Sequence, residues 1–267
     1  MGLGAIGKPM AHRLAPHFDL QVADVDPGPV ADLVSVGATA VDALGDLDVE
    51  VLCVMVRDDD QVREVLAEVQ PGPVVLVHST VAPGTPAELV EAGHTVLDAP
   101  VSGGTLGAAD GTLAIMVGGP PPAYAAAQPV LRRLGSTVVH AGPLGAGTAM
   151  KLARNLIHFI ALAGVTEAQR LAEAAGLDLI ALGDVVRHSD AITGGPGAIM
   201  HRATAAPPSP DDAWYPILDH VRSLGEKDLS LAIGLADELG VDTPLAREAL
   251  QRLAAGLGIA SDQSAGA

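Results

Sequence analysis

The stretch Gly2-Leu3-Gly4-Ala5-Ile6-Gly7 decides the fold that this sequence predicts. Its glycines have the spacing G-x-G-x-x-G, and a helix-like segment and a strand-like segment, residues 20–23, follow them. In this context the glycines indicate a phosphate-binding turn that opens a dinucleotide-binding domain. The motif alone would be a weak signal, because the chain contains 31 glycines.

Strand-like and helix-like segments alternate along the first half of the chain. Short apolar runs stand at residues 51–56, 74–77, 95–97, 113–117 and 137–139. This alternation favours the α/β class, a Rossmann-type doubly wound parallel sheet. From Gly147 onward the apolar residues recur at helical spacing. We therefore expect a dinucleotide-binding domain over residues 1–144 and an all-α substrate and oligomerisation domain over residues 145–267, whose last seven residues form a frayed tail.

The first strand of the predicted sheet is truncated. A dinucleotide fingerprint normally follows a strand of five or six apolar residues, but here only Met1 precedes Gly2. The loss of that strand would leave its two neighbours without a partner. Three explanations are open: a true start upstream, a fragment, or a damaged protein. We favour the first, because the rest of the sequence is coherent.

Composition excludes several classes of protein. The net charge is −17 and the pI is about 4.6, so the surface repels nucleic acid and anionic lipid. We find no apolar run long enough to span a bilayer and no signal peptide, and Cys53 is the single cysteine. These features predict a soluble, cytoplasmic protein without disulfides. The histidines show no pair at metal-ligand spacing, so no metal is expected.

Acidic residues after the second predicted strand indicate which dinucleotide would bind. Asp24 stands where a carboxylate would accept hydrogen bonds from the ribose hydroxyls, and Val25 and Asp26 follow. A 2′-phosphate would meet carboxylates and no arginine, which favours NAD over NADP. Alternatively, Asp24 and Asp26 simply begin a turn before Pro27.

Lys151 is a candidate for proton transfer. It is one of only three lysines among 15 basic residues, and a lysine can lose its proton where an arginine cannot. Lys151 and Asn155 are four residues apart on a predicted helix, so both side chains project from one face. The alternative is a helix with two polar residues that face solvent.

Several segments together resemble the β-hydroxyacid dehydrogenase family, which includes 3-hydroxyisobutyrate dehydrogenases and, more distantly, 6-phosphogluconate dehydrogenase. Besides the glycine motif, they are Ser79-Thr-Val-Ala-Pro83, Asp98-Ala-Pro-Val-Ser-Gly-Gly104, Gly145-Ala-Gly-Thr-Ala-Met-Lys151-Leu-Ala-Arg-Asn155 and Glu226-Lys-Asp-Leu229. Their order and spacing match the family over nearly the whole chain. The resemblance implies reversible, NAD-dependent oxidation of a small β-hydroxy acid to its semialdehyde or keto acid.

The resemblance also implies roles for individual residues. Lys151 would be the general acid/base and Asn155 its positioning partner, while Ser102, Gly103 and Gly104 would bind the substrate carboxylate. The cofactor would contact the whole glycine motif from Gly2 to Gly7, Asp24, Val25, Met55, Val56 and Thr80. Family members associate through the helical domain, so a homodimer or homotetramer is expected.

Two residues late in the chain complete the expected site. By resemblance Lys227 lies beside both nicotinamide and substrate, where a second cation would lower the pKa of Lys151. The family usually has an aromatic residue seven positions earlier, where this chain has His220. This departure leaves the substrate open, and His220 could equally be an ordinary histidine on the helix surface.

Two other functions compete with this interpretation. Imine reductases share the architecture and use NADPH, but they typically lack a lysine at the position of Lys151 and favour a cation for the 2′-phosphate. A protein that binds NAD without turnover is the second alternative, and the truncated first strand supports it.

Overall fold

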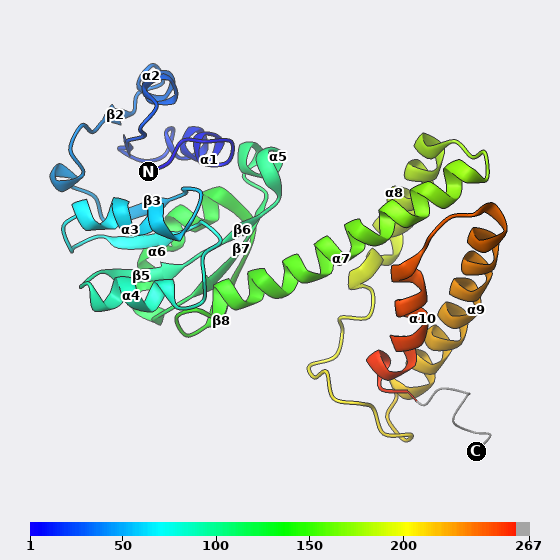
Figure 1. The fold of residues 1–267 in the computed structure, drawn as a ribbon. Helices are drawn as coiled ribbons and strands as arrows, with labels where there is room; N and C mark the ends of the chain where they lie inside the picture. The colour runs from blue at the N-terminus through cyan, green and yellow to red at the C-terminus, as the bar shows by residue number, and fades with distance from the viewer. Residues whose placement is uncertain (260–267) are drawn as a thin grey trace. The chain divides into compact units, whose positions relative to one another are not determined.

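The computed structural model describes residues 1–259, so the expected tail over residues 261–267 lies outside the described residues. The chain divides into two compact units, the first spanning Met1–Asn155 and the second beginning at Leu156 (Figure 1). The predicted boundary after residue 144 lies just before helix α7 (Ala146–Ala174), whose first turns belong to the first unit.

The first unit contains a six-stranded sheet in the order β3-β4-β5-β7-β6, with β8 paired to β7. Its strands are β3 (Val51–Val54), β4 (Val74–Val77), β5 (Thr95–Asp98), β6 (Val101–Ser102), β7 (Leu113–Gly118) and β8 (Gly135–Gly142). The predicted parallel arrangement is confirmed for β3, β4 and β5 and for the β7–β8 pair. β7 runs antiparallel to β5 and β6, because only a short helix, α5 (Gly104–Asp110), separates β6 from β7.

Helices cover both faces of this sheet. On one face, α1 (Gly7–Leu14), α5 and α6 (Pro121–Leu134) pack on Leu76 and Leu97. On the other face, α3 (Asp59–Glu68) and α4 (Thr85–Glu91) pack on Val75 and Val96. Burial on both faces explains why these strands are continuous apolar runs rather than alternating ones.

A separate two-stranded parallel sheet stands at the start of the chain. It consists of β1 (Gln21–Val22) and β2 (Thr39–Ala40), with α2 (Pro27–Val34) between them and the short 3-10 helix η1 (Leu44–Asp46) after them. Its own small core contains Leu3, Ala11, Val22, Leu33 and Ala38.

The second unit is helical, as predicted. It contains the greater part of α7, then α8 (Leu179–Thr193), the 3-10 helix η2 (Gly195–Gly197), α9 (Tyr215–Leu239) and α10 (Pro244–Leu257). Glu167 of α7 ties these helices together, because its buried carboxylate accepts hydrogen bonds from the first amides of α10, Leu245 at 2.8 Å and Ala246 at 3.0 Å. Within residues 1–259, none of the helices has the length and apolar character required to span a membrane.

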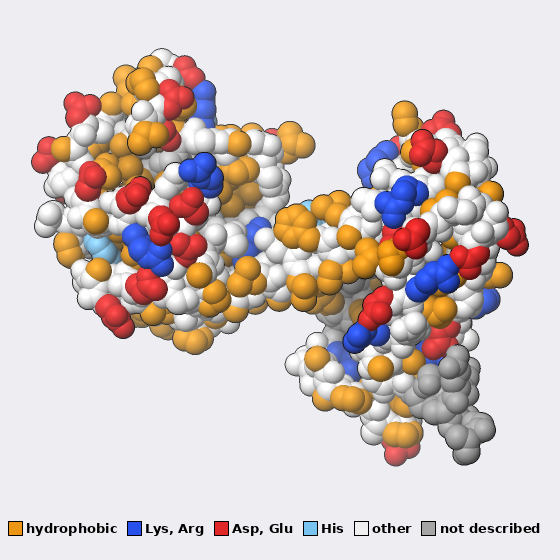
Figure 2. All heavy atoms as spheres, in the orientation of Figure 1, with side chains coloured by type: hydrophobic (Ala, Val, Ile, Leu, Met, Phe, Trp, Pro, Cys, Tyr) orange, Lys and Arg blue, Asp and Glu red, His pale blue; other side chains and the backbone are white. Residues whose placement is uncertain are grey.

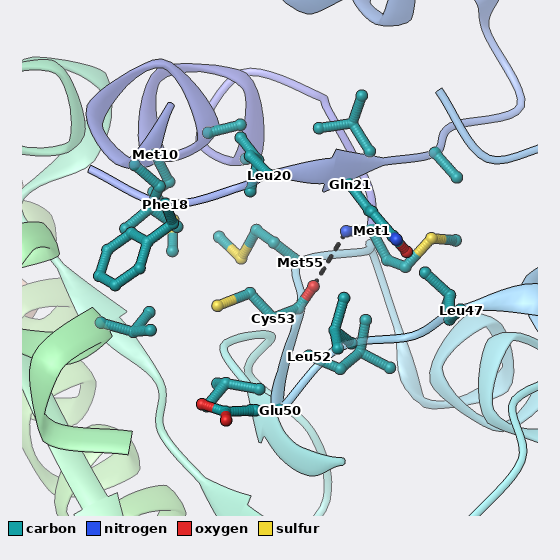
Figure 3. Close-up of a pocket in the computed structure, with 18 of the residues that line it drawn as sticks. Met1, Met10, Phe18, Leu20, Gln21, Leu47, Glu50, Leu52, Cys53 and Met55 are labelled. Atoms are coloured by element: carbon teal, nitrogen blue, oxygen red, sulfur yellow. Dashed lines mark hydrogen bonds between the residues drawn. The ribbon is translucent and has the colours of Figure 1, made fainter. Parts of the chain in front are cut away.

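An open slot separates β1 from β3 (Figure 3). It is a cavity of about 410 Å³ with a largely apolar lining that includes Met10, Leu20, Leu52 and Cys53. Met1 occupies one end: its amine donates to the Cys53 carbonyl at 3.0 Å, and its carbonyl accepts from the Met55 amide at 3.0 Å.

Backbone groups of both β1 and β3 face the slot. Because bonds alternate along a parallel ladder, the amides and carbonyls of Gln21, Val51 and Cys53 point into the slot while their neighbours bond β2 and β4. Burial also lowers the pKa of the Met1 amine. The slot therefore has the hydrogen-bonding groups to accept one parallel strand.

A short apolar extension on Met1 is expected to fill this slot. Five Val, Ile or Ala residues fused to the amine would pair with both strands and raise the free energy of unfolding by about 2 kcal/mol or more, as measured in urea. NADH affinity should also rise. In the control, proline stands two positions before Met1, where an amide should donate to the Val51 carbonyl. Equal stability of the two extended proteins would contradict the prediction.

Candidate functional site

Each glycine of the motif has a different surrounding. Gly2 has φ +79°, and a Cβ there would overlap the Met55 carbonyl. A Cβ on Gly7 would overlap the Gly2 carbonyl, whereas a Cβ on Gly4 would meet no heavy atom outside its own turn within 4 Å. These are the three requirements of a dinucleotide loop: a tight turn, an open backbone for the pyrophosphate, and close packing of helix on strand.

Asp24 holds this loop from the end of β1. Its carboxylate accepts hydrogen bonds from the amide of Leu3 and, at 2.8 Å, from the amide of Asp26. Asp26 in turn caps α2 by accepting from the Gly28 amide at 2.9 Å. The turn before Pro27 is therefore present, and the contact of Asp24 with a ribose stays a prediction.

The ends of β3 and β4 complete this edge of the sheet. Met55 and Val56 lie directly beside Gly2. The Ser79 hydroxyl accepts from the Val56 amide at 3.0 Å and donates to its carbonyl at 2.7 Å, which ties the two strand ends together. The structure thus brings the glycine loop, Met55 and Val56 together at the carboxyl ends of the strands, and Thr80 follows Ser79 with an exposed side chain.

These surroundings fit a dinucleotide. The open space at Gly4 and the first turn of α1 offer backbone amides to a diphosphate. Val25 is fully exposed, so it leaves room for a ribose beside Asp24. The nearby Lys8 forms an ion pair with Asp32.

Lys151 meets the segment that connects β5 to α5. Only 8% of the residue is exposed, and its ammonium donates to the Val101 carbonyl at 2.6 Å. Burial lowers the pKa of Lys151, and the positive charge of Arg154 lowers it further. Ser102, Gly103 and Gly104 follow Val101 directly, so the structure places the predicted base at the predicted carboxylate-binding turn.

Gly103 and Gly104 adopt backbone conformations that favour glycine. Their φ angles are +139° and +63°, which side-chain-bearing residues rarely adopt. A Cβ on Gly104 would meet no heavy atom outside its own turn within 4 Å. The turn therefore exposes backbone at the place where a small anion could approach.

For the other predicted site residues, within residues 1–259, the structure shows no side-chain hydrogen bond to Lys151 or to the glycine turn. Asn155 is half-buried one turn after Lys151, and its side-chain oxygen accepts from Arg154 at 3.3 Å. His220 and Lys227 lie on α9 in the second unit, where Lys227 pairs with Asp228 at 3.0 Å. Their approach to Lys151 stays a prediction.

The sequence analysis did not single out two residues that lie close to Lys151 or to the start of its helix. Besides burial, the charge of Arg154 lowers the pKa of Lys151, and the expected effect of Lys227 stays a prediction. Asp98 is fully buried and accepts hydrogen bonds from the amides of Gly145 at 2.7 Å and Thr148 at 2.6 Å. A carboxylate at the end of an apolar strand was the available signal for Asp98. No group of three or more potential metal ligands occurs among residues 1–259.

Two family descriptions match the chain almost end to end. The NAD-binding domain of 6-phosphogluconate dehydrogenase matches residues 1–142, and the NAD-binding domain of NADP-dependent 3-hydroxyisobutyrate dehydrogenase matches residues 145–266. Together with the glycine loop and the helical second unit, they define an NAD-binding oxidoreductase. The chain belongs to the β-hydroxyacid dehydrogenase family. NAD is the cofactor that these matches support, and NADP is compatible with them.

Individual relatives agree with this assignment. An uncharacterised oxidoreductase of Mycobacterium tuberculosis is 49% identical, over 97% of this chain and 92% of the relative. A 3-hydroxyisobutyrate dehydrogenase of Pseudomonas aeruginosa is 36% identical, over 92% and 87%. The crystal structure of an oxidoreductase from Mycobacterium avium has a TM-score of 0.92 and 46% identity, over 97% and 98%.

The imine reductases share the fold. One from Streptomyces aurantiacus has a TM-score of 0.77 but only 21% identity, over 98% of this chain and 95% of that one. At that identity the likeness concerns architecture alone.

Alanine substitutions at the glycines should separate ligand approach from folding. Gly4→Ala is expected to leave the melting temperature nearly unchanged but to weaken NADH binding by about tenfold or more, because a methyl group enters the space left for the diphosphate. Gly7→Ala should lower the melting temperature strongly, since its Cβ overlaps the Gly2 carbonyl.

Gly72→Ala is the matched control, as its Cβ would also meet nothing within 4 Å but lies in the turn before β4. NADH fluorescence titration and thermal melting provide the measurements. Undiminished NADH affinity in Gly4→Ala would show that the cofactor does not lie against this loop.

Proposed function

We propose that this enzyme reversibly oxidises a small β-hydroxy acid to its semialdehyde or keto acid, with NAD as oxidant and Lys151 as general acid/base. The observation that carries the proposal is the setting of Lys151: a buried lysine of lowered pKa, donating to the Val101 carbonyl directly before an open glycine turn. The candidate proton acceptor thus contacts the short segment that carries the candidate anion-binding turn.

Each of the proposed site residues has a separate role in the reaction. Neutral Lys151 accepts the proton of the substrate hydroxyl, and in the reverse direction its ammonium returns that proton to the carbonyl oxygen. Ser102 and the amides of Gly103 and Gly104 hold the substrate carboxylate. Bound NAD supplies the chemistry of hydride acceptance from the alcohol carbon. Asn155, one turn along the helix, orients the reacting group together with Lys151.

The second unit contributes two residues in this proposal. Lys227 completes the cationic surroundings of the nicotinamide and the substrate acid group. His220, two turns before Lys227 on α9, is the residue that we propose helps to select among hydroxy acids.

The cofactor preference follows from charge at the end of β1. Asp24 and Asp26 flank the fully exposed Val25, so a 2′-phosphate would meet two carboxylates. We therefore favour NAD over NADP. The same argument and the presence of Lys151 disfavour an imine reductase. Turnover of a hydroxy acid would distinguish the proposed enzyme from a protein that only binds NAD. The lone Cys53, which leaves no partner within the chain for a disulfide, favours a reducing compartment such as the cytoplasm.

A screen of hydroxy acids tests the reaction. The panel contains 3-hydroxyisobutyrate, glycerate and 4-hydroxybutyrate, with NAD reduction followed at 340 nm after NADH binding has been established by fluorescence. Reduction with one or more of these acids is expected. NADH binding without any turnover would favour a binder, and reduction of cyclic imines with NADPH would favour the imine reductase alternative.

The pH dependence of oxidation should report Lys151. Because oxidation requires the neutral amine, kcat should rise with pH through an apparent pKa below the ordinary 10.5. Lys151→Ala should lower kcat by about 10²- to 10⁴-fold and remove this limb. Lys151→Arg keeps the charge but cannot lose a proton, so it should be equally inactive. Wild-type turnover in either variant would show that the mechanism is wrong.

Homo-oligomerisation through the helices is the remaining part of the proposal. Hydrophobic side chains gather along α7 (Figure 2), including Leu156, Phe159 and Ile160, each more than 60% exposed. Apolar patches of this kind mark interaction sites, and a second copy of the chain offers the same surface.

Charges on that face should separate the copies. Phe159→Glu with Ile160→Glu is expected to reduce the particle mass, measured by light scattering at about 10 µM, from a dimer or tetramer to a monomer of 26.8 kDa. The control is Val90→Glu, which places a charge on an exposed apolar residue of α4 in the first unit. A monomeric wild type would overturn this part of the proposal.

A further inference from the structure

Asp98 is a buried carboxylate that the proposed chemistry does not use. It is the last residue of β5 and is fully buried. One carboxylate oxygen accepts from the Gly145 amide at 2.7 Å, and the other accepts from the Thr148 amide at 2.6 Å. Asp98 therefore satisfies two of the amides that a helix leaves unpaired at its start, where the helix dipole also favours a negative charge.

The same segment holds the helix at a second point. Three residues after Asp98, the Val101 carbonyl accepts the Lys151 ammonium at 2.6 Å. Thr148 and Lys151 are three residues apart on α7, so the two attachments lie nearly one helical turn apart. The depth to which Lys151 is buried thus depends on where Asp98 holds the start of α7.

Close backbone packing leaves the carboxylate little alternative. A Cβ on Gly118 would overlap Asp98 Oδ1 and lie 2.7 Å from the Gly147 nitrogen. A Cβ on Gly147 would lie 2.6 Å from the Asp98 carbonyl and would also overlap the Met116 carbonyl. Because a buried carboxylate is stable only while its hydrogen bonds persist, α7 cannot shift along the sheet without leaving this charge unpaired.

We propose that Asp98 is the positioning residue for Lys151: through its two bonds to the start of α7, it sets the burial of the Lys151 ammonium on the β5–α5 segment. This inference rests on the proposed function for its catalytic consequence, but its structural part can be measured without any substrate. Asp98 acts through the position of the helix, since burial and Arg154 are the causes of the lowered pKa of Lys151.

The chain offers a matched control for a carboxylate that only stabilises a helix. Glu167, also buried, accepts from the first amides of α10 at 2.8 and 3.0 Å, in the second unit. Asp98→Asn and Glu167→Gln each replace a carboxylate by an isosteric amide. Both should lower the melting temperature, because each places the NH2 donor of an amide beside a backbone N–H donor.

Lysine labelling distinguishes the two roles. The chain has only three lysines, so acetic anhydride labelling between pH 7 and 11, read by peptide mass spectrometry, gives the pKa of Lys151 separately. In Asp98→Asn we expect this pKa to rise toward the ordinary value and, where a substrate is known, kcat to fall about tenfold or more with its pH limb moved upward. Glu167→Gln should change neither.

The outcomes separate the two proposals. A shifted Lys151 pKa in a protein that oxidises no acid would support the positioning role and count against the proposed reaction. An unshifted pKa in Asp98→Asn, with a melting temperature lowered as in Glu167→Gln, would overturn the positioning role. If Asp98→Asn does not fold, Asp98→Glu provides the same comparison, because it keeps the charge and changes only its reach.

Discussion

Three backbone hydrogen bonds at Met1 and Gly2 join the two sheets of the first unit. Met1 bonds the end of β3 on one side, and Gly2 donates to the Ala23 carbonyl at 3.2 Å on the other. The glycine loop, the carboxylate of Asp24 and the ends of β3 and β4 all take their positions from this junction. The candidate site thus lies at the carboxyl end of a sheet with an open slot beside this junction. We therefore expect cofactor binding to be coupled to the stability of the β1–β2 sheet.

Buried charge is handled differently at the two ends of the site. Each carboxylate oxygen of Asp98 accepts a hydrogen bond from a backbone amide. Lys151 is buried against the Val101 carbonyl and has a cation, Arg154, as a neighbour, so its pKa is lowered. A hydrogen-bonded carboxylate and a lysine that is easier to deprotonate therefore lie on one short segment and on the helix attached to it.

Local sequence predicted the elements and the residue types of the site, but not the long-range contacts that arrange them. The glycine spacing, the apolar runs and the helical periodicity were sufficient for the two-part architecture and for Lys151 on a helix. The antiparallel pairing of β7 was not predictable, because apolar runs carry no strand direction. Asp98 was also missed as a functional residue: its partners lie 47 and 50 residues farther along the chain, and no spacing rule connects them.

Because the chain is strongly acidic, the binding of an anion depends on which hydrogen-bond donors the site provides. With a net charge of −17, the mean field repels both a dinucleotide and a carboxylate substrate. Backbone amides in glycine turns are neutral dipoles that do not titrate. They can therefore donate hydrogen bonds to an anion at close range at any pH. The loop around Gly4 and the turn at Gly103 and Gly104 supply such groups. In the proposed reaction Lys151 is then free to exchange its proton, because the binding of anions would not depend on its remaining charged.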